Sequence, residues 1–268
     1  ADIADLVTPE VSLLAALRSS SFRRGFVSSD PRLASAARTV SRMGKFRLNP
    51  ALMSRASEIP EILTADVGAR PPLPRMLYEG ERLASVLYFL SRTRSPQLDE
   101  IVRGVASAID GFEGFEFNSV PSGLVGFSAR FSDSRDVVEA PNLSSGTLAL
   151  IGWLTLLLRG DRQPILMIEE PELGLTPRST EAVYAAIRQA AHGGVVAERS
   201  QILIASHSPY LLSAVAQDEG FSAVYRMTPV AGEARSLTYD EALEEGGIGQ
   251  SFERGMAVEV ANQVMHRF

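Results

Sequence analysis

The feature that most constrains this chain is a short apolar run that ends in two adjacent carboxylates. The run 165–168 reads Ile-Leu-Met-Ile, and Glu169 and Glu170 follow it directly. Such a run predicts a buried strand, whereas acids are almost never fully buried unless they are paired or bind a metal. Two adjacent acids also repel, so a cation or a proton is expected beside them. The pattern indicates a strand end that can hold Mg²⁺ and orient a water, or a strand that simply meets solvent.

Two other segments also carry polar residues at the end of an element. Downstream, the apolar run 201–205 ends at Ser206-His207-Ser208. Upstream, within the segment 142–147, Ser144, Ser145 and Gly146 are small, and an apolar stretch after this segment predicts a helix over 147–158. Ligands of an open parallel sheet gather outside the carboxyl ends of its strands, and a helix N-terminus with small residues is an anion site. The three segments together therefore fit one binding site.

In this order, the three segments resemble the second half of an ABC-type ATPase head. More narrowly, the chain resembles the AAA-family ATPases related to the SMC and OLD groups. The matching stretches are 143–147 (LSSGT), 165–175 (ILMIEEPELGL) and 206–209 (SHSP). The resemblance is close over residues 140–215 and only general over 46–138. It implies a P-loop NTPase α/β sheet with helices on both faces, which uses ATP and Mg²⁺.

The resemblance also implies a role for each matching residue. Glu169 would be the Walker B acid that acts on Mg²⁺, and Glu170 would be the general base that orients or deprotonates the attacking water. His207 would be the switch histidine at the γ-phosphate. The signature motif, which reaches the ATP held by a second subunit, would consist of Ser144, Ser145, Gly146 and Thr147. Relatives often carry His where this chain has Thr176, so no role is carried over to that residue.

A phosphate-binding loop of the form G-x-x-x-x-G-K-[ST] is missing from the sequence. Lys45 is the only lysine, and Gly44 precedes it. Phe46 stands where Ser or Thr must bind Mg²⁺, and Thr39 stands where the first glycine belongs. We expect the loop to come from an N-terminal lobe outside these residues or from a partner chain. A degenerate head that cannot bind ATP by itself is the alternative.

Periodicity and chain breakers predict two parts. Residues 1–110 are expected to form a mostly helical insertion and connection, irregular over 46–78, with helices at 9–43, 80–92 and 96–109. Residues 111–268 are expected to form the ATPase-like lobe. Its alternating strands and helices predict a parallel sheet that is covered on both faces. The expected strands are 115–120, 124–131, 137–138, 165–169, 201–205 and about 222–227, and the expected helices are 147–158, 178–191, about 209–216 and about 251–267.

Composition excludes several classes of site. The chain has no cysteine, so it has neither a disulfide nor a thiolate metal site, and its three histidines show no zinc spacing. The longest apolar stretch, 148–158, is shorter than the roughly 20 residues that span a bilayer. These features suit a cytoplasmic protein. The net charge is −6, yet residues 18–55 hold nine basic residues and one acid, which could face nucleic acid, an acidic partner or solvent.

The resemblance favours an ATPase that forms a homodimer on ATP and drives a partner or effector, in a DNA-repair or defence-type system. The ATPase subunit of a transporter is a second reading. It is disfavoured because 171–175 does not resemble a transporter's interface loop and because Thr147 stands where transporters usually have Gln. A non-catalytic interaction module that keeps the fold is the third reading. A nuclease activity in this chain is not expected, since no second cluster of spaced acids follows His207.

Overall fold

A computed structural model describes ten stretches of the chain. These are residues 43–60, 74–120, 123–133, 136–159, 163–192, 200–206, 208, 211, 224–227 and 234–237. Of the expected helices, 251–267 and nearly all of 9–43 and 209–216 lie outside these stretches. His207 lies outside them as well, so its predicted role stays a prediction.

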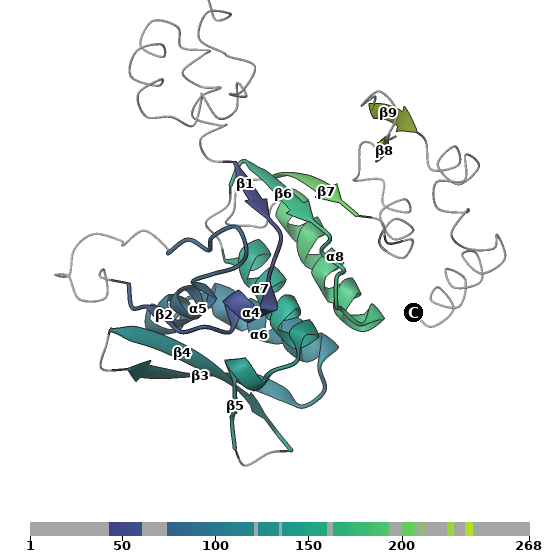
Figure 1. Cartoon of the computed structure of the whole chain (residues 1–268). Helices are drawn as coiled ribbons and strands as arrows, with labels where there is room; N and C mark the ends of the chain where they lie inside the picture. The colour runs from purple at the N-terminus through teal and green to yellow at the C-terminus, as the bar shows by residue number, and fades with distance from the viewer. Residues whose placement is uncertain are drawn as a thin grey trace, which may run out of the picture.

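The site is organised by a three-stranded sheet in the order β1-β6-β7, and both pairings in it are parallel (Figure 1). The strands are β1 (Gly44–Phe46), β6 (Ile165–Glu169) and β7 (Gln201–Ala205). Alternate residues of β6 point to opposite faces, and Leu166 and Ile168 lie in the hydrophobic core. Two helices, α7 (Ser145–Leu158) and α8 (Pro177–His192), share that core. The expected α/β fold class is thereby confirmed.

Helix α7 is the centre of the packing. Its residues 148–158 are all buried, and it contacts α4, α5, α6 and α8. A helix that is apolar on every side must be covered on every side, which explains this position. The helix begins two residues before the expected start, because the Ser144 side chain caps it by accepting a hydrogen bond from the Thr147 amide at 3.0 Å. No helix within the described residues is long and apolar enough to cross a membrane.

A second, antiparallel sheet lies on the other side of the helices, with the order β2-β4-β3 and with β5 on the β2 edge of β4 (Figure 1). Its strands are β3 (Phe112–Val120), β4 (Leu124–Phe131), β5 (Val138–Glu139) and β2 (Ser57–Glu58). Helices α5 (Leu83–Arg92) and α6 (Pro96–Ala108) pack against it. A short 3-10 turn, η3 (Ala140–Asn142), links β5 to the loop before α7. The strands and helices predicted over 80–138 are therefore confirmed, with shifts of a few residues at their ends.

The prediction that 46–78 is an irregular connection was wrong in part. This stretch contains the end of β1, the helix α4 (Pro50–Met53) and β2. The Asn49 side chain caps α4 by accepting a hydrogen bond from the Ala51 amide at 3.1 Å, and Pro50 suits the first helical position. Met53 is fully buried against Gly152 of α7, where a Cβ would lie 2.5 Å from its sulfur. Tertiary packing thus fixes a helix that is too short to show periodicity.

The later strands of the chain form a separate ribbon. The strand expected near 222–227 is β8 (Val224–Met227), and it pairs antiparallel with β9 (Ala234–Leu237), which the sequence did not predict. Both sheets described above combine strands from the two sides of residue 110, since β1 pairs with β6 and β2 with β4. The division into 1–110 and 111–268 stays a proposal.

Candidate functional site

The carboxyl ends of the three parallel strands meet at one edge of the sheet (Figure 1). Phe46 of β1 is in register with Ile168 of β6, and Glu169 is in register with Ala205 of β7. The residues that follow each strand therefore lie side by side. They are Arg47 after β1, Glu170 after β6 and Ser206 after β7. This is the edge at which an open parallel sheet binds its ligands.

Glu169 is held by two donors that the sequence did not predict. The ammonium of Lys45 lies 2.6 Å from Glu169 Oε1, and the hydroxyl of Tyr78 donates to Glu169 Oε2 at 3.1 Å. Lys45 is opposite Met167 in the β1–β6 register, so it shares a face of the sheet with Glu169 and reaches it diagonally. The ammonium also lies 5.6 Å from the centre of the Tyr78 ring, within cation–π range.

These contacts favour the charged forms of both partners. The hydrogen bond from Lys45 holds the pKa of Glu169 below its ordinary value, and the Tyr78 hydroxyl lowers this pKa further, while burial opposes both effects. The same hydrogen bond raises the pKa of Lys45. Because the folded-state pKa of Glu169 lies below the unfolded one, the pair stabilises the fold at neutral pH. That contribution is lost as the pH falls below about 4.5 and through the folded pKa.

Removal of the Tyr78 hydroxyl is expected to raise the pKa of Glu169. Tyr78→Phe deletes one donor to the carboxylate, whereas Lys45→Met deletes the stronger donor and the positive charge, and it is expected to raise this pKa further. Carboxyl ¹³C NMR titration of glutamate-labelled protein measures the shift, and Glu169→Gln identifies the signal. A Glu169 signal that titrates at the same pH in the wild-type chain, in Tyr78→Phe and in Lys45→Met would contradict the geometry of these contacts.

Glu170 has an unusual backbone. Its φ of 47° lies in the left-handed region, where a residue with a Cβ costs about 1–3 kcal/mol. Its amide donates to the Ala205 carbonyl at 2.8 Å, and its carboxylate lies 3.1 Å from the guanidinium of Arg47. The neighbouring strands β7 and β1 therefore fix the conformation. Strain of this kind is typical of functional sites, because it aims a side chain that regular strand geometry would not.

The turn after Glu170 is tied to the end of β7. The Leu173 amide donates to the Glu170 carbonyl at 3.0 Å, which closes the turn. The Ser206 hydroxyl donates to Glu172 Oε1 at 2.6 Å. Glu172 Oε2 is buried and has no hydrogen-bond partner among the described residues. The third acid of the 169–172 motif therefore positions the segment that leads into His207.

The predicted signature residues lie against this turn. A Cβ on Gly146 would lie 2.5 Å from the Gly174 carbonyl oxygen, so only glycine allows the start of α7 to approach the turn this closely. Ser144 and Ser145 are exposed, and the hydroxyls of Ser144 and Thr147 are 2.8 Å apart. The structure thus brings together the signature residues and the motif of the two acids.

Sequence analysis missed Lys45, Arg47 and Tyr78 as members of the site. Lys45 was considered only as the lysine of a phosphate-binding loop, and it does not belong to one. A usable signal was the spacing of Lys45 and Arg47, since basic residues two apart around a buried Phe46 point to the same face of a strand. Tyr78 had no such signal, because it reaches Glu169 from a loop 91 positions away in the sequence.

The donor set fits Mg²⁺, although it does not form a closed metal site. The described residues contain no group of three or more His, Cys, Asp or Glu side chains that could hold a metal ion by themselves. Mg²⁺ prefers one or two carboxylates and fills its remaining positions with water and substrate phosphates. Glu169 and Glu170 can supply the carboxylates at an open sheet edge. Water and substrate phosphates would complete the coordination of a Mg²⁺ ion here.

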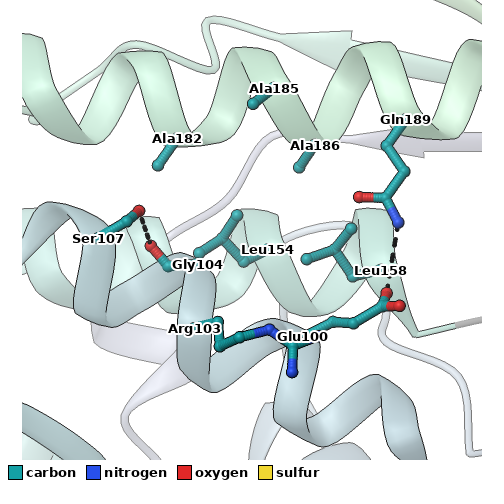
Figure 2. Close-up of a pocket in the computed structure, with 10 residues that line it drawn as sticks. All are labelled: Glu100, Arg103, Gly104, Ser107, Leu154, Leu158, Ala182, Ala185, Ala186 and Gln189. Carbon is teal, nitrogen blue, oxygen red and sulfur yellow. Dashed lines mark hydrogen bonds between the residues drawn. The ribbon is translucent and has the colours of Figure 1, made fainter.

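A pocket of about 310 Å³ lies elsewhere, between α6 and α8 and above Leu154 and Leu158 of α7 (Figure 2). Gln189 Nε2 donates to Glu100 Oε2 at 3.3 Å across its end. None of the predicted site residues that the structure describes lines this pocket. The residues that line the pocket are Leu154, Leu158, Glu100, Gln189, Arg103, Gly104, Ser107, Ala182, Ala185 and Ala186.

Comparison with solved structures finds structures of SMC ATPases and of Smc heads. One belongs to a study of ATP-driven dimerization and DNA-stimulated activation of SMC ATPases, with 14% identity, a TM-score of 0.44 and coverage of 59% of this chain and 94% of the other. Another is the Smc head domain with an extended coiled coil bound to the C-terminal domain of ScpA from Pyrococcus furiosus, with 15% identity, a TM-score of 0.42 and coverage of 60% of this chain and 39% of the other. A third is an Smc head bound to the C-winged helix domain of ScpA, with 14% identity, a TM-score of 0.40 and coverage of 60% of this chain and 49% of the other.

A comparison with family models shows the family of the chain. No curated protein matches the chain. The family model described as "AAA domain, putative AbiEii toxin, Type IV TA system" matches residues 61–213, which is more than half of the chain. The match spans the signature residues, both acids and the Ser206–His207 segment. The chain therefore belongs to this AAA family of ATPase domains, as the motifs predicted.

Proposed function

We propose that this chain is part of an ATP-binding and ATP-hydrolysing head, which dimerises on ATP and drives a partner or effector. One observation carries the proposal. Glu169 ends the central strand and Glu170 follows it directly, and the first turn of α7 lies against the turn after these acids, at Gly146 and Gly174. Family membership supports the same activity. The family description names a toxin of a type IV TA system, which favours a defence-type role over DNA repair.

The chain's own residues suit the steps of phosphoryl transfer to water. Glu169 would hold Mg²⁺, which neutralises charge on the phosphates. Glu170, turned off the strand by its left-handed backbone, would accept the proton of the attacking water. His207 would contact the γ-phosphate from the end of β7. Catalysis of this kind depends mostly on positioning and on charge stabilisation. The sheet edge would supply the positioning, and Mg²⁺ would supply the positive charge.

The exposed start of α7 would complete a second active site. Ser144 and Ser145 point to solvent at a helix N-terminus, where backbone N–H groups favour an anion. In a two-fold dimer this turn would reach the γ-phosphate that the other subunit holds, and the reverse contact would complete the equivalent site. The phosphate-binding loop would come from an N-terminal lobe outside these 268 residues or from a partner chain. We also propose a cytoplasmic location. The basic stretch 18–55 is the part of the sequence through which nucleic acid would be bound.

A non-catalytic interaction module is the second candidate. It is favoured by one observation, namely that both acids are already neutralised, Glu169 by Lys45 and Glu170 by Arg47. Such pairs keep an acidic sheet edge stable without any ligand. In this reading the α7 turn and the acid motif serve only as a rigid surface.

ATP hydrolysis by the purified 268-residue chain distinguishes the two candidates. The assay is run with Mg²⁺ or with EDTA, and with or without the polypeptide that carries the phosphate-binding loop. We expect Mg²⁺-dependent turnover only when that loop is present, since the sequence itself contains no loop of the form G-x-x-x-x-G-K-[ST] to hold the β- and γ-phosphates. Absence of turnover from the combined polypeptides would favour the non-catalytic module.

A further inference from the structure

Lys45 contacts one oxygen of the carboxylate that is proposed to hold the metal ion. Its ammonium is 2.6 Å from Glu169 Oε1, while the other carboxylate oxygen accepts a hydrogen bond from Tyr78 at 3.1 Å. Both oxygens of the metal-ligand candidate are therefore engaged by donors. A divalent cation that approaches Oε1 meets a positive charge 2.6 Å from the same oxygen, so its binding is disfavoured while the ammonium stays there.

We propose that Lys45 is a built-in competitor of the divalent cation: its ammonium occupies Glu169 in the ligand-free chain, and metal binding displaces it. The proposal rests on the proposed role of Glu169 as the metal ligand. It assigns to Lys45 the control of metal affinity, which no motif of the chain predicts. Without nucleotide, the site would then bind a free metal ion weakly and keep its acids neutralised.

The surroundings of Lys45 allow this displacement. The side chain is 48% exposed and carries four flexible methylene groups, so it can leave Glu169 without unpacking the core. The Tyr78 ring, 5.6 Å from the ammonium, remains available as a cation–π partner after release. Arg47 pairs with Glu170, and its charge acts on Glu169 only at longer range, so Lys45 is the cation that contacts Glu169 directly.

Binding of Mn²⁺ alone, measured by electron paramagnetic resonance without nucleotide, tests the proposal. Lys45→Met is expected to bind Mn²⁺ about tenfold more tightly than the wild-type chain, because it removes the competing charge while solvent screening limits the gain. Lys45→Arg keeps the charge and is expected to stay within about twofold of the wild type. Arg130→Met makes the same change in net charge in the antiparallel sheet, where Arg130 pairs with Glu113 and Glu116. It is expected to leave the Mn²⁺ binding that depends on Glu169 unchanged.

A direct readout follows from the fact that Lys45 is the only lysine. Labelling with [ε-¹⁵N]lysine gives a single side-chain NMR signal, which reports on this ammonium alone. We expect addition of Mg²⁺ to move the signal toward the position of a free lysine side chain. In Glu169→Gln, we expect the lysine signal to lie at that position before Mg²⁺ is added. Addition of Mg²⁺ should then leave the signal where it is.

The outcomes separate this inference from the proposed function. Mn²⁺ binding that needs Glu169 but is no tighter in Lys45→Met overturns the competition and leaves the role of Glu169 intact. A lysine signal that stays fixed while Mg²⁺ binds at Glu169 does the same. Mn²⁺ binding that survives in Glu169→Gln removes the metal role of Glu169 and, with it, the basis of both proposals. Failure of Lys45→Met to bind Mn²⁺ at all also overturns the inference, because removing the competitor must open the site.

Discussion

In the head completed with the phosphate-binding loop, Glu170→Gln is expected to lower ATP turnover by about 10²–10⁴-fold, the contribution that a positioned general base typically makes. Gln has the shape of Glu but cannot accept a proton from water at neutral pH. The substitution preserves the amide that donates to Ala205, and the side-chain oxygen can still accept from Arg47. ATP binding should therefore persist, so that the variant accumulates an ATP-bound dimer.

Two measurements check this prediction. Phosphate release gives the turnover, and light scattering with ATP gives the mass of the dimer. Glu58→Gln, a change of the same type in β2 of the antiparallel sheet, is the matched control and should retain full turnover. Undiminished turnover in Glu170→Gln would remove the role of general base. A variant that fails to bind ATP would point instead to a structural role for the pair with Arg47.

The local pattern of the chain predicted the elements that carry the motif. The apolar run before Glu169 and the run before Ser206 are both strands, and residues 147–158 are helical, because buried strands and a fully covered helix leave long apolar signals. The position of the acids at the rim followed from the cost of burying charge. These parts depend on residues close together in the sequence, which is why they could be predicted.

The residues that surround the acids depend on the register of the parallel sheet. Arg47 contacts Glu170 from 123 positions away, and Tyr78 contacts Glu169 from 91 positions away. Strand β1 has only three residues, and its place beside β6 comes from the crossover of the chain rather than from its own composition. A single sequence carries no signal for this pairing. The cations of the site were therefore missed, although the acids that they neutralise were predicted.

The close approach of Gly146 to Gly174 changes how the signature motif can be tested. Gly146→Asp is expected to block ATP-dependent dimerisation, because a negative charge would face the phosphates of the second subunit. A Cβ at this position would, however, lie 2.5 Å from the Gly174 carbonyl oxygen, which belongs to the backbone and cannot move aside cheaply. Gly146→Ala alone is thus expected to cost about 1–3 kcal/mol of stability, as overpacking usually does.

Ser145→Asp separates the charge from the steric effect. Ser145 is exposed at the first position of α7, where an acid interacts favourably with the helix dipole, so unfolding by denaturant should change by no more than about 0.5 kcal/mol. The new charge would still repel the phosphates across the dimer. We therefore expect light scattering with ATP to show a monomer for Ser145→Asp, while unfolding by denaturant shows full stability for this variant. For Gly146→Ala, unfolding by denaturant is expected to show a destabilised chain. A stable Ser145→Asp that still dimerises on ATP would show that the start of α7 does not face the second nucleotide. In that case the contact with Gly174 would be a packing feature of the acid turn.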